Sequence, residues 1–493
     1  MLEYKNLKYE IIIGCELHVQ LLTKTKAFCS CENKYGGFPN TRVCPVCLAL
    51  PGAMPTTSKD YVEYGIKAGH ALGCKINNYS RFDRKHYFYP DLAKGYQITQ
   101  FYFPLCQDGE VEINIAAQNE KPIIKKIGIE RIHLEEDAGK SLHIEGNYSY
   151  IDFNRCGVPL IEIVSKPDMR SGDEASIYMQ TIREILKFIG ITDGNLEEGA
   201  IRCDANVNVH IIDGGAKFAT LISEIKNMNS FKAVKDATTY EAMRQLKEYE
   251  EGMRYQFRAG EKRTMGWDDS ASETIMQRAK MESEDYRFMM EPDLKPINLS
   301  QAYINEVCSS IGELPSEKRA RYRKDYELSE FDVHLLTSDA GIAMWFEKAI
   351  VDSKHPKKIA NWILTNILSI LNEQKISIDE LKIKPSHINQ LVGLIEDAKI
   401  TSKQGKEVFA KMIKTGDSPE KIAKDEGMEL LDDEALIKKL IEDVFSQHLG
   451  AIEEYKKGKT NVLPWLVGQV IKASHAKANP KMVHTLVTQK LKE

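Results

Sequence analysis

The chain has 493 residues, of which 42% are hydrophobic and 28% charged, and its formal net charge is −5 at pH 7. This is the composition of a folded protein of roughly three domains, and it argues against a disordered, fibrous or nucleic-acid-coating protein. The sequence has no apolar run of about 18 residues, and its first residues lack the apolar part of a secretion signal. We therefore expect a cytoplasmic protein without a membrane segment.

The first predicted element is a strand over residues 9–21. Its period-two pattern places Glu16, His18 and Gln20 on one face and apolar side chains on the other. A carboxylate, an imidazole and an amide in a row suggest chemistry, although solvent alone explains the polar face of many antiparallel strands.

Four of the ten cysteines follow this strand. They form the pattern Cys29-x-Cys31, twelve residues, and Cys44-x-x-Cys47. Two close pairs separated by a loop can supply the four thiolates of a tetrahedral zinc ion, and such a closed site would be structural because no position is left for a substrate water. The alternative is four reduced thiols without a metal.

The segment of residues 81–97 combines basic side chains, among them Arg84 and Lys85, with five aromatic rings. Cations for phosphates and rings for base stacking are typical of contact with single-stranded RNA. The same groups also suit a nucleotide pocket or a rim packed with aromatic side chains.

Three more segments, residues 131–137, 201–209 and 223–227, repeat the alternation of the first strand. If the polar faces meet, they make a concave sheet with the hard ligands that suit Mg²⁺ or Mn²⁺ holding a phosphate. The alternative is again an ordinary solvent-facing set of strands. The polar positions are Arg131, His133, Glu135, Arg202, Asp204, Asn206, Asn208, Glu224 and Lys226.

A helix is predicted over residues 171–190, between these strands. Ser171 and Glu174 have capping-box spacing, and Ile182 and Leu186 follow at helical intervals. The sequence contains neither a P-loop motif nor a dinucleotide-binding glycine motif after a strand, so any ATP must be bound in another way.

The pattern becomes helical after about residue 292, as in residues 361–372 and 433–447. We therefore predict an α+β fold in which a domain of about 290 residues precedes two smaller helical parts. The charge also changes along this half: residues 376–454 carry 11 lysines against 17 acids, whereas residues 455–493 carry 8 lysines and one acid. The basic end indicates either contact with a polyanion or a solvated helical end.

The residues alone leave two classes of protein open. One is a metal-dependent enzyme that acts on phosphorylated or carboxylate substrates, and the other is an RNA-binding protein without catalytic activity. Aligned carboxylates favour the enzyme, because acids that face an RNA backbone would repel it.

Several long motifs resemble, in the same order, the B-subunit family of bacterial aspartyl/glutamyl-tRNA amidotransferases. The resemblance extends from about residue 9 to the C-terminus. The matching segments are residues 13–21, 84–91, 133–140, 152–160, 202–207, 224–230, 284–288 and 467–480.

The resemblance implies an activity. A protein of this family uses ATP and Mg²⁺ to phosphorylate the side-chain carboxylate of Glu-tRNA(Gln) or Asp-tRNA(Asn), and ammonia from the glutaminase A subunit then displaces the phosphate. A small C subunit completes the heterotrimer. The implied fold is an antiparallel-sheet cradle domain with a zinc knuckle (residues 1–293), a helical domain (294–377) and an all-α tail domain that binds tRNA (378–493).

The resemblance also implies roles for individual residues. The Mg²⁺ ligand candidates are Glu16, His18, Glu135, Asp204 and Glu224, and Lys85 joins Glu16, His18 and Glu135 as a catalytic candidate. Candidates for phosphate or substrate contacts are Arg84, Lys85, Arg131, Arg155, Arg202 and Lys226. The structural zinc would bind Cys29, Cys31, Cys44 and Cys47, and tRNA would contact Lys472, Lys477 and Lys481 in the tail.

Overall fold

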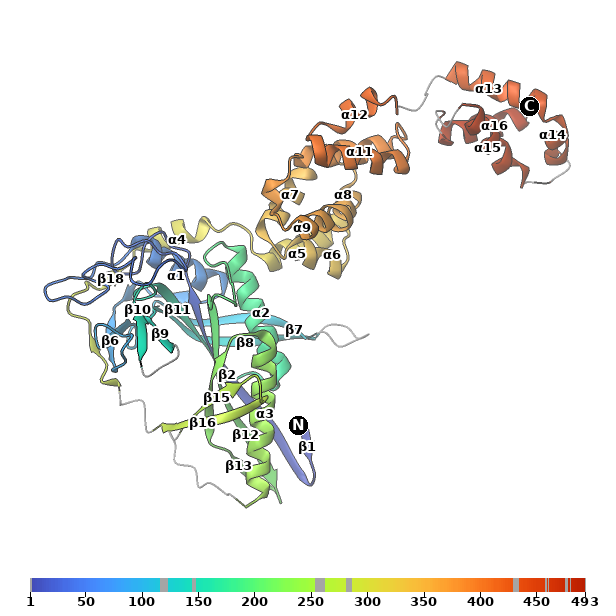
Figure 1. Ribbon diagram of the computed structural model, residues 1–493. Coiled ribbons are helices and arrows are strands. Elements are labelled where there is room, and N and C mark those ends of the chain that lie inside the picture. Colours follow the sequence, from blue (N-terminus) through green and yellow to red (C-terminus); the bar gives the residue numbers. More distant parts are fainter. Residues whose placement is uncertain are drawn as a thin grey trace. The chain divides into compact units, whose positions relative to one another are not determined.

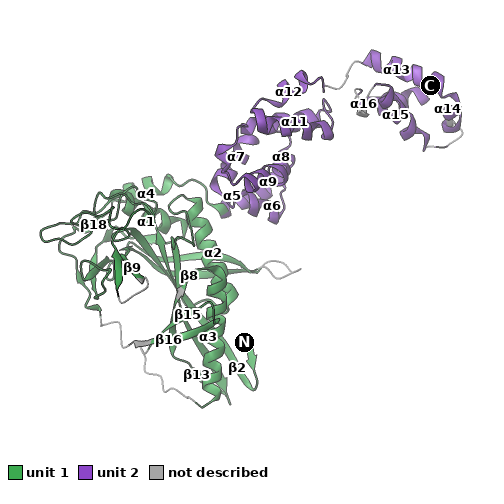
Figure 2. Ribbon diagram, in the orientation of Figure 1, with its two compact units in different colours: residues 1–315 green, residues 316–493 purple. Residues whose placement is uncertain are grey.

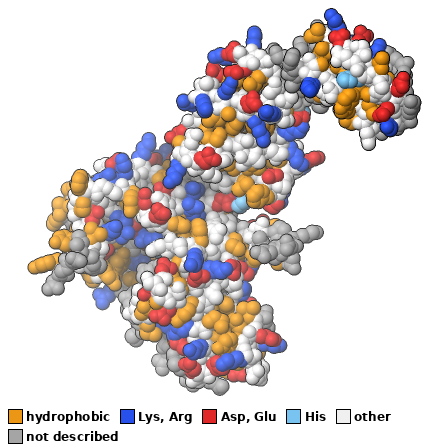
Figure 3. Space-filling model, turned by 45° about the vertical axis from the view of Figure 1, so that its right-hand side comes forward, with side chains coloured by type: hydrophobic (Ala, Val, Ile, Leu, Met, Phe, Trp, Pro, Cys, Tyr) orange, Lys and Arg blue, Asp and Glu red, His pale blue; other side chains and the backbone are white. Residues whose placement is uncertain are grey.

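A computed structural model describes residues 2–115, 123–143, 148–252, 262–280, 286–428, 434–456, 459, 461–474, 478 and 480–492. The chain forms two compact units, Met1–Pro315 and Ser316–Glu493 (Figure 2). On the face shown in Figure 3, basic and acidic side chains are interspersed over both units. Within the described ranges, no helix is both long enough and apolar enough to span a membrane.

An 11-stranded sheet dominates the first unit, and its central path runs β16-β15-β14-β12-β2-β11-β8-β7-β3 (Figure 1). All neighbouring pairs are antiparallel except β14 and β15, which are parallel. The bounds are β1 Leu2–Tyr4, β2 Leu7–Gln20, β3 Lys75–Ile76, β7 Cys106–Ile115, β8 Ile123–Glu136, β11 Pro159–Ser165, β12 Ile201–Asp213, β13 Ala216–Ala219, β14 Ile222–Met228, β15 Lys262–Asp268 and β16 Glu273–Lys280. The predicted α+β class is confirmed.

Three small sheets and four α-helices complete the described part of this unit. The small sheets pair β10 with β9, β18 with β4, and β5 with both β17 and β6. Their bounds are β4 Tyr79–Ser80, β5 Asp83–His86, β6 Tyr96–Thr99, β9 Lys140–His143, β10 Ser149–Asp152, β17 Met289–Met290 and β18 Ile297–Asn298. The helices are α1 Lys59–Ala71, α2 Gly172–Phe188, α3 Phe231–Glu250 and α4 Gln301–Ser309.

Helices α2 and α3 lie side by side against one face of the large sheet (Figure 1). The Ser171 hydroxyl accepts a hydrogen bond from the backbone N–H of Glu174, as the capping pattern predicts, and α2 begins there. Its buried Ile182 and Leu186 belong to the same apolar core as Leu17 of β2. Because strand side chains alternate, the other face of β2 is left to Glu16 and His18.

The second unit is entirely helical in its described residues. Residues 322–423 share one apolar core, and residues 437–491 form another. The helices are α5 Pro315–Tyr326, α6 Glu330–Leu336, α7 Ala340–Ala349, α8 Pro356–Trp362, the π-helical turn η2 Ile363–Ile367, α9 Leu368–Gln374, the 3₁₀ turn η3 Ile378–Glu380, α10 Pro385–Glu396, α11 Ser402–Thr415, α12 Pro419–Asp425, α13 Glu434–Gln447, α14 Leu449–Lys456, α15 Val462–Ala473 and α16 Pro480–Lys492. The functional boundaries at residues 293 and 377 stay predictions.

Candidate active site and metal centres

The register of four adjacent strands brings polar side chains together on the face away from α2 and α3. His18 of β2 lies opposite Glu162 of β11 on one side and opposite Arg202 of β12 on the other. Glu162 in turn lies opposite His133 of β8. Residues that are directly opposed in antiparallel strands point to the same face, so pairing alone assembles this group.

Two histidines and two carboxylates form the centre of the group. Glu162 Oε2 lies 3.4 Å from His18 Nε2 and 3.1 Å from His133 Nε2, and Glu135 Oε2 lies 3.4 Å from His133 Nε2. One ligand atom each from His18, Glu135 and Glu162 falls within 4.8 Å of the others. Two carboxylates and an imidazole can hold Mg²⁺ or Mn²⁺. We call these three residues the metal cluster.

The metal cluster is held in place by buried polar neighbours. Gln97 donates to Glu135, and the Thr99 hydroxyl lies 3.0 Å from Glu135 Oε2. Burial alone would lower the pKa of His18, but the charge of Glu162 raises it to about 9. Burial likewise opposes ionisation of Glu162, but the histidines hold its pKa well below the usual range. A metal ion would therefore take the place of the His18 proton.

The remaining candidate ligands lie beside the metal cluster and have other partners. Lys226 Nζ lies 2.9 Å from Asp204 Oδ2 and 2.9 Å from Glu224 Oε1. Asn206 Nδ2 donates to Glu16 Oε1 at 2.8 Å. The structure thus groups His18 and Glu135 with Glu162, whereas Asp204 and Glu224 share a lysine.

Burial and neighbouring charges shift the pKa values of Glu16 and Lys226. Burial, together with the charges of Glu162 and Glu224, raises the pKa of Glu16. Burial opposes the charge on Lys226, but Asp204 and Glu224 raise the pKa of its ammonium. The site therefore contains a fixed positive charge close to the metal cluster.

The two adjacent basic candidates of β5 differ in their surroundings. Arg84 donates to Glu291 at 2.8 and 2.9 Å and to Asp293 at 3.0 Å. Lys85 lies over the ring of Tyr286, and the charges of Glu135 and Glu162 raise its pKa although burial lowers it. Neighbouring residues of a strand point to opposite faces, so Lys85 lies near Glu135 and Glu162 while Arg84 ties β5 to the segment after β17.

Asp137 anchors the basic groups at the end of the strands. Arg202 Nη2 and Gln20 Nε2 each lie 3.0 Å from Asp137 Oδ2. Arg155 donates to the backbone carbonyl oxygens of Ala138 and Gly139 at 3.0 and 2.7 Å. Burial disfavours the Asp137 charge, but Arg202 and Arg155 hold its pKa below the usual value.

A cavity of about 1070 Å³, here called the central cavity, opens beside these arginines. Its lining combines basic and amide side chains, three carboxylates (Asp152, Glu197 and Glu198) and part of the loop between the two cysteine pairs. The lining includes Gln20, Asn33, Lys140, Arg155, Arg183, Asn195 and Arg202. A space of this size with convergent cationic groups suits a phosphorylated or carboxylate ligand.

The four clustered cysteines meet as the spacing predicts. Cys47 Sγ lies 3.4 Å from Cys29 Sγ and 3.7 Å from the sulfur atoms of Cys31 and Cys44. These separations are close to the edge of about 3.8 Å of a sulfur tetrahedron around zinc. A hydrogen bond from Cys29 lowers the pKa of Cys47 to about 4, and the Lys26 ammonium, 3.5 Å away, adds to the effect. The cluster fits a structural zinc ion.

With the site assembled, comparison with known proteins decides the family. Residues 11–305 match the model of the GatB/GatE catalytic domain, and residues 344–491 match that of the GatB domain. The chain belongs to the GatB family. The predicted resemblance is confirmed.

Known members of this family include proteins named as the B subunit of aspartyl/glutamyl-tRNA(Asn/Gln) amidotransferase. The Treponema denticola protein is 65% identical over 493 residues, which cover all of both chains. The Treponema pallidum protein is 54% identical, over 98% of this chain and 95% of its own length. The Thermodesulfovibrio yellowstonii protein is 44% identical, over 99% of this chain and 100% of its own length.

The family assignment leaves the individual residue roles as predictions, and the structure adds one residue to them. Glu162 is not among the residues that the sequence predicts, because β11 is buried along its whole length and its acid interrupts an apolar run. A lone carboxylate in such a strand is the signal that could have identified it.

The tail candidates are described only in part. Lys472 is exposed near the end of α15. Lys477 lies outside the described residues, and so does the side chain of Lys481. Their contact with tRNA stays a prediction.

Proposed function

We propose that the chain is the subunit of an ATP-dependent amidotransferase that converts Glu-tRNA(Gln), Asp-tRNA(Asn) or both into Gln-tRNA(Gln) and Asn-tRNA(Asn). The observation that carries this proposal is the metal cluster beside an arginine-lined cavity. The chain that contains it is 65% identical, end to end, to a protein named for this activity.

The chemistry requires two steps because a free carboxylate is a poor acyl donor. In the first, a side-chain carboxylate oxygen of the misattached amino acid attacks the γ-phosphorus of ATP, and ADP leaves. In the second, ammonia attacks the acyl carbon, inorganic phosphate leaves, and the nitrogen loses its extra proton as the amide forms. Phosphoryl transfer of this kind depends on positioning and charge neutralisation.

The metal cluster would hold Mg²⁺, which neutralises phosphate charge when it is bound. Around it, Lys226 of β14 and Lys85 of β5 supply fixed ammonium groups. Glu16 is oriented by Asn206 at the edge of the group. These residues bind and orient two anionic substrates that would otherwise repel each other.

Arg131, Arg155 and Arg202 are the proposed contacts for the substrate anions. The Nε atoms of Arg131 and Arg202 are buried and have no hydrogen-bond partner among the described residues. Buried donors of this kind are normally satisfied, so an anionic ligand would complete them. Arg155 lines the central cavity.

The chain would work in a heterotrimer with a glutaminase A subunit and a small C subunit, since ammonia must come from another chain. The cysteine cluster would hold a structural Zn²⁺. The basic C-terminal part, including Lys472, Lys477 and Lys481, would contact the tRNA backbone. The relatives are each named as one subunit of an amidotransferase, which supports a multi-subunit assembly.

An RNA-binding protein without catalytic activity is the alternative. The carboxylates of the metal cluster argue against it, because acids that face an RNA backbone would repel its phosphates. The test is the assembled heterotrimer with ATP, Mg²⁺, glutamine and each mischarged tRNA. We expect tRNA-dependent ADP release and amide formation. A complex that binds mischarged tRNA and leaves ATP intact would refute the proposal and support the alternative.

A further inference from the structure

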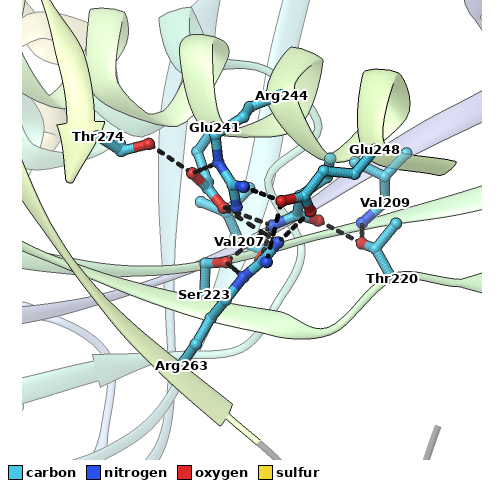
Figure 4. A network of polar contacts seen from close by, with 10 residues as sticks. Val207, Val209, Thr220, Ser223, Glu241, Arg244, Glu248, Arg263 and Thr274 are labelled. Carbon is cyan, nitrogen blue, oxygen red and sulfur yellow. Dashed lines mark hydrogen bonds and ion pairs between the residues drawn. The ribbon is translucent and has the colours of Figure 1, made fainter. Parts of the chain in front are cut away.

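A buried polar network joins α3 to β12, β14, β15 and β16 (Figure 4). Ser223 of β14 is fully buried, and its hydroxyl oxygen accepts from Gln245 Nε2 of α3 at 3.0 Å and from Arg263 Nε of β15 at 2.8 Å. Gln245 also donates to the Val207 carbonyl of β12 at 3.1 Å. The Ser223 hydroxyl and the Gln245 amide together thus connect one helix with three strands.

Charged side chains complete the network. Glu241 of α3 is fully buried and accepts from Arg244 and from the Thr274 hydroxyl of β16, the latter at 2.7 Å. Arg263 reaches Glu248 at 3.0 Å. Apolar residues of the same volume often stabilise a fold as well as or better than buried ion pairs, so stability alone is a weak reason for this arrangement.

The network bears on the site because strand side chains alternate. Ser223 faces α3, and the next residue, Glu224, therefore faces the site, as does Lys226. The pairing of β12 with β14 is irregular at this point, since Cys203 is opposite Met228 but Ala205 is opposite Ile225. One extra residue of β14 falls between these pairs. A bulge of this kind changes the direction of nearby side chains. The regular hydrogen bonds of the sheet alone therefore do not fix the position of the Lys226 side chain.

We propose that Ser223 and Gln245 are positioning residues for phosphoryl transfer, which hold β14 so that Lys226 Nζ stays between Asp204 and Glu224. The proposal rests on the proposed function. The network holds β14 from the face opposite the site, where neither substrate reaches. The ammonium group of Lys226 therefore keeps a constant position beside the metal cluster.

The test compares variants of one network. Ser223→Ala removes the shared acceptor, and Gln245→Met removes the donor at similar volume. Thr274→Val is the matched control, because it removes a hydrogen bond to Glu241 from β16, two strands away from β14. Each variant is measured in the assembled complex for kcat and KM of tRNA-dependent ATP cleavage and for Tm.

We expect Ser223→Ala and Gln245→Met to lower kcat about tenfold or more, with KM for ATP changed less than about twofold. Thr274→Val should lower Tm about as much as these two variants do but keep the wild-type kcat. Wild-type kcat in Ser223→Ala or Gln245→Met, or an equal loss of kcat in Thr274→Val, would overturn the positioning role.

If the wild-type complex shows no ATP cleavage, that result counts against the proposed function itself. A crystal structure of Ser223→Ala still tests whether the network fixes the position of Lys226. We expect Lys226 Nζ to lose hydrogen-bond distance to Asp204 or Glu224. A retained bridge to both carboxylates would overturn the proposal.

Discussion

His18 and Glu162 face each other across β2 and β11, with His18 Nε2 3.4 Å from Glu162 Oε2. The pair brings an imidazole of the first long strand to a carboxylate that lies in an otherwise apolar strand. This contact defines the metal cluster and gives it a ligand that the motif pattern does not reveal.

The first prediction follows from this contact. Glu162→Gln should lower tRNA-dependent ATP cleavage by about 100-fold or more, because it removes one ligand and one negative charge from the metal cluster. The measurement is ADP release by the assembled complex, together with Mn²⁺ binding by the chain. Glu112→Gln on β7, an exposed acid, is the control. Undiminished Mn²⁺ binding by Glu162→Gln would show that the metal lies elsewhere.

The second prediction concerns how the free energy of unfolding depends on pH. Burial opposes the charge of Glu241, but the hydrogen bond and charge of Arg244 lower its pKa below 4.5. A depressed carboxyl pKa contributes stability that is present above the unfolded pKa and lost as the pH falls through the folded pKa. Glu241→Gln should therefore lower the free energy of unfolding by about 3 kcal/mol at neutral pH.

The difference in free energy of unfolding between wild type and Glu241→Gln should narrow as the pH falls below 4.5, because the carboxylate is then protonated in the unfolded chain first and in the folded chain only at lower pH. Thermal unfolding at pH 7, 5 and 4 measures this difference. The exposed Glu251→Gln at the end of α3 should track the wild type. A constant difference at every pH would contradict the assigned ionisation.

The third prediction concerns the cysteine cluster. We expect one zinc ion per chain, and a Cys44→Ser/Cys47→Ser variant should lose it together with roughly 5 °C or more of Tm. The loop between the cysteine pairs lines the central cavity, so the KM of the substrate that binds in this cavity should rise as well. Metal analysis and unfolding measure the first effects, with Cys308→Ser as the control. Zinc-free purified protein with full stability would contradict the prediction.

The fourth prediction concerns the C-terminal part. Residues 322–423 share one core, so a truncation at residue 377 would divide it, whereas a deletion of residues 429–493 spares it. This deletion should weaken tRNA binding and reduce its salt dependence, because residues 455–493 carry 8 lysines and one acid. Filter binding at two salt concentrations measures both effects. Unchanged affinity and slope in an assembled complex would instead indicate a packing role.

The sequence predicts the first long strand and its polar face because period-two alternation is a local signal, and His18 is found in this way. Glu162 cannot be predicted by alternation, since β11 is buried along its whole length. The bridge of Lys226 to Asp204 depends on an irregular pairing of two strands, which is a tertiary feature. The four cysteines are predictable because their spacing is itself the geometric requirement.

The place of β2 in the sheet has a consequence for biosynthesis. Only residues 7–9 of β2 pair with the preceding β1; Gln20 pairs with Leu160 and Val19 with Ile201, so the two strands that flank the part with His18 are made long after β2 has left the ribosome. Contacts so distant in sequence form slowly, and an unpaired strand with one apolar face is prone to aggregate while it waits. The nascent chain therefore exposes β2 until β12 has been translated, and only then can the face that carries His18 be completed.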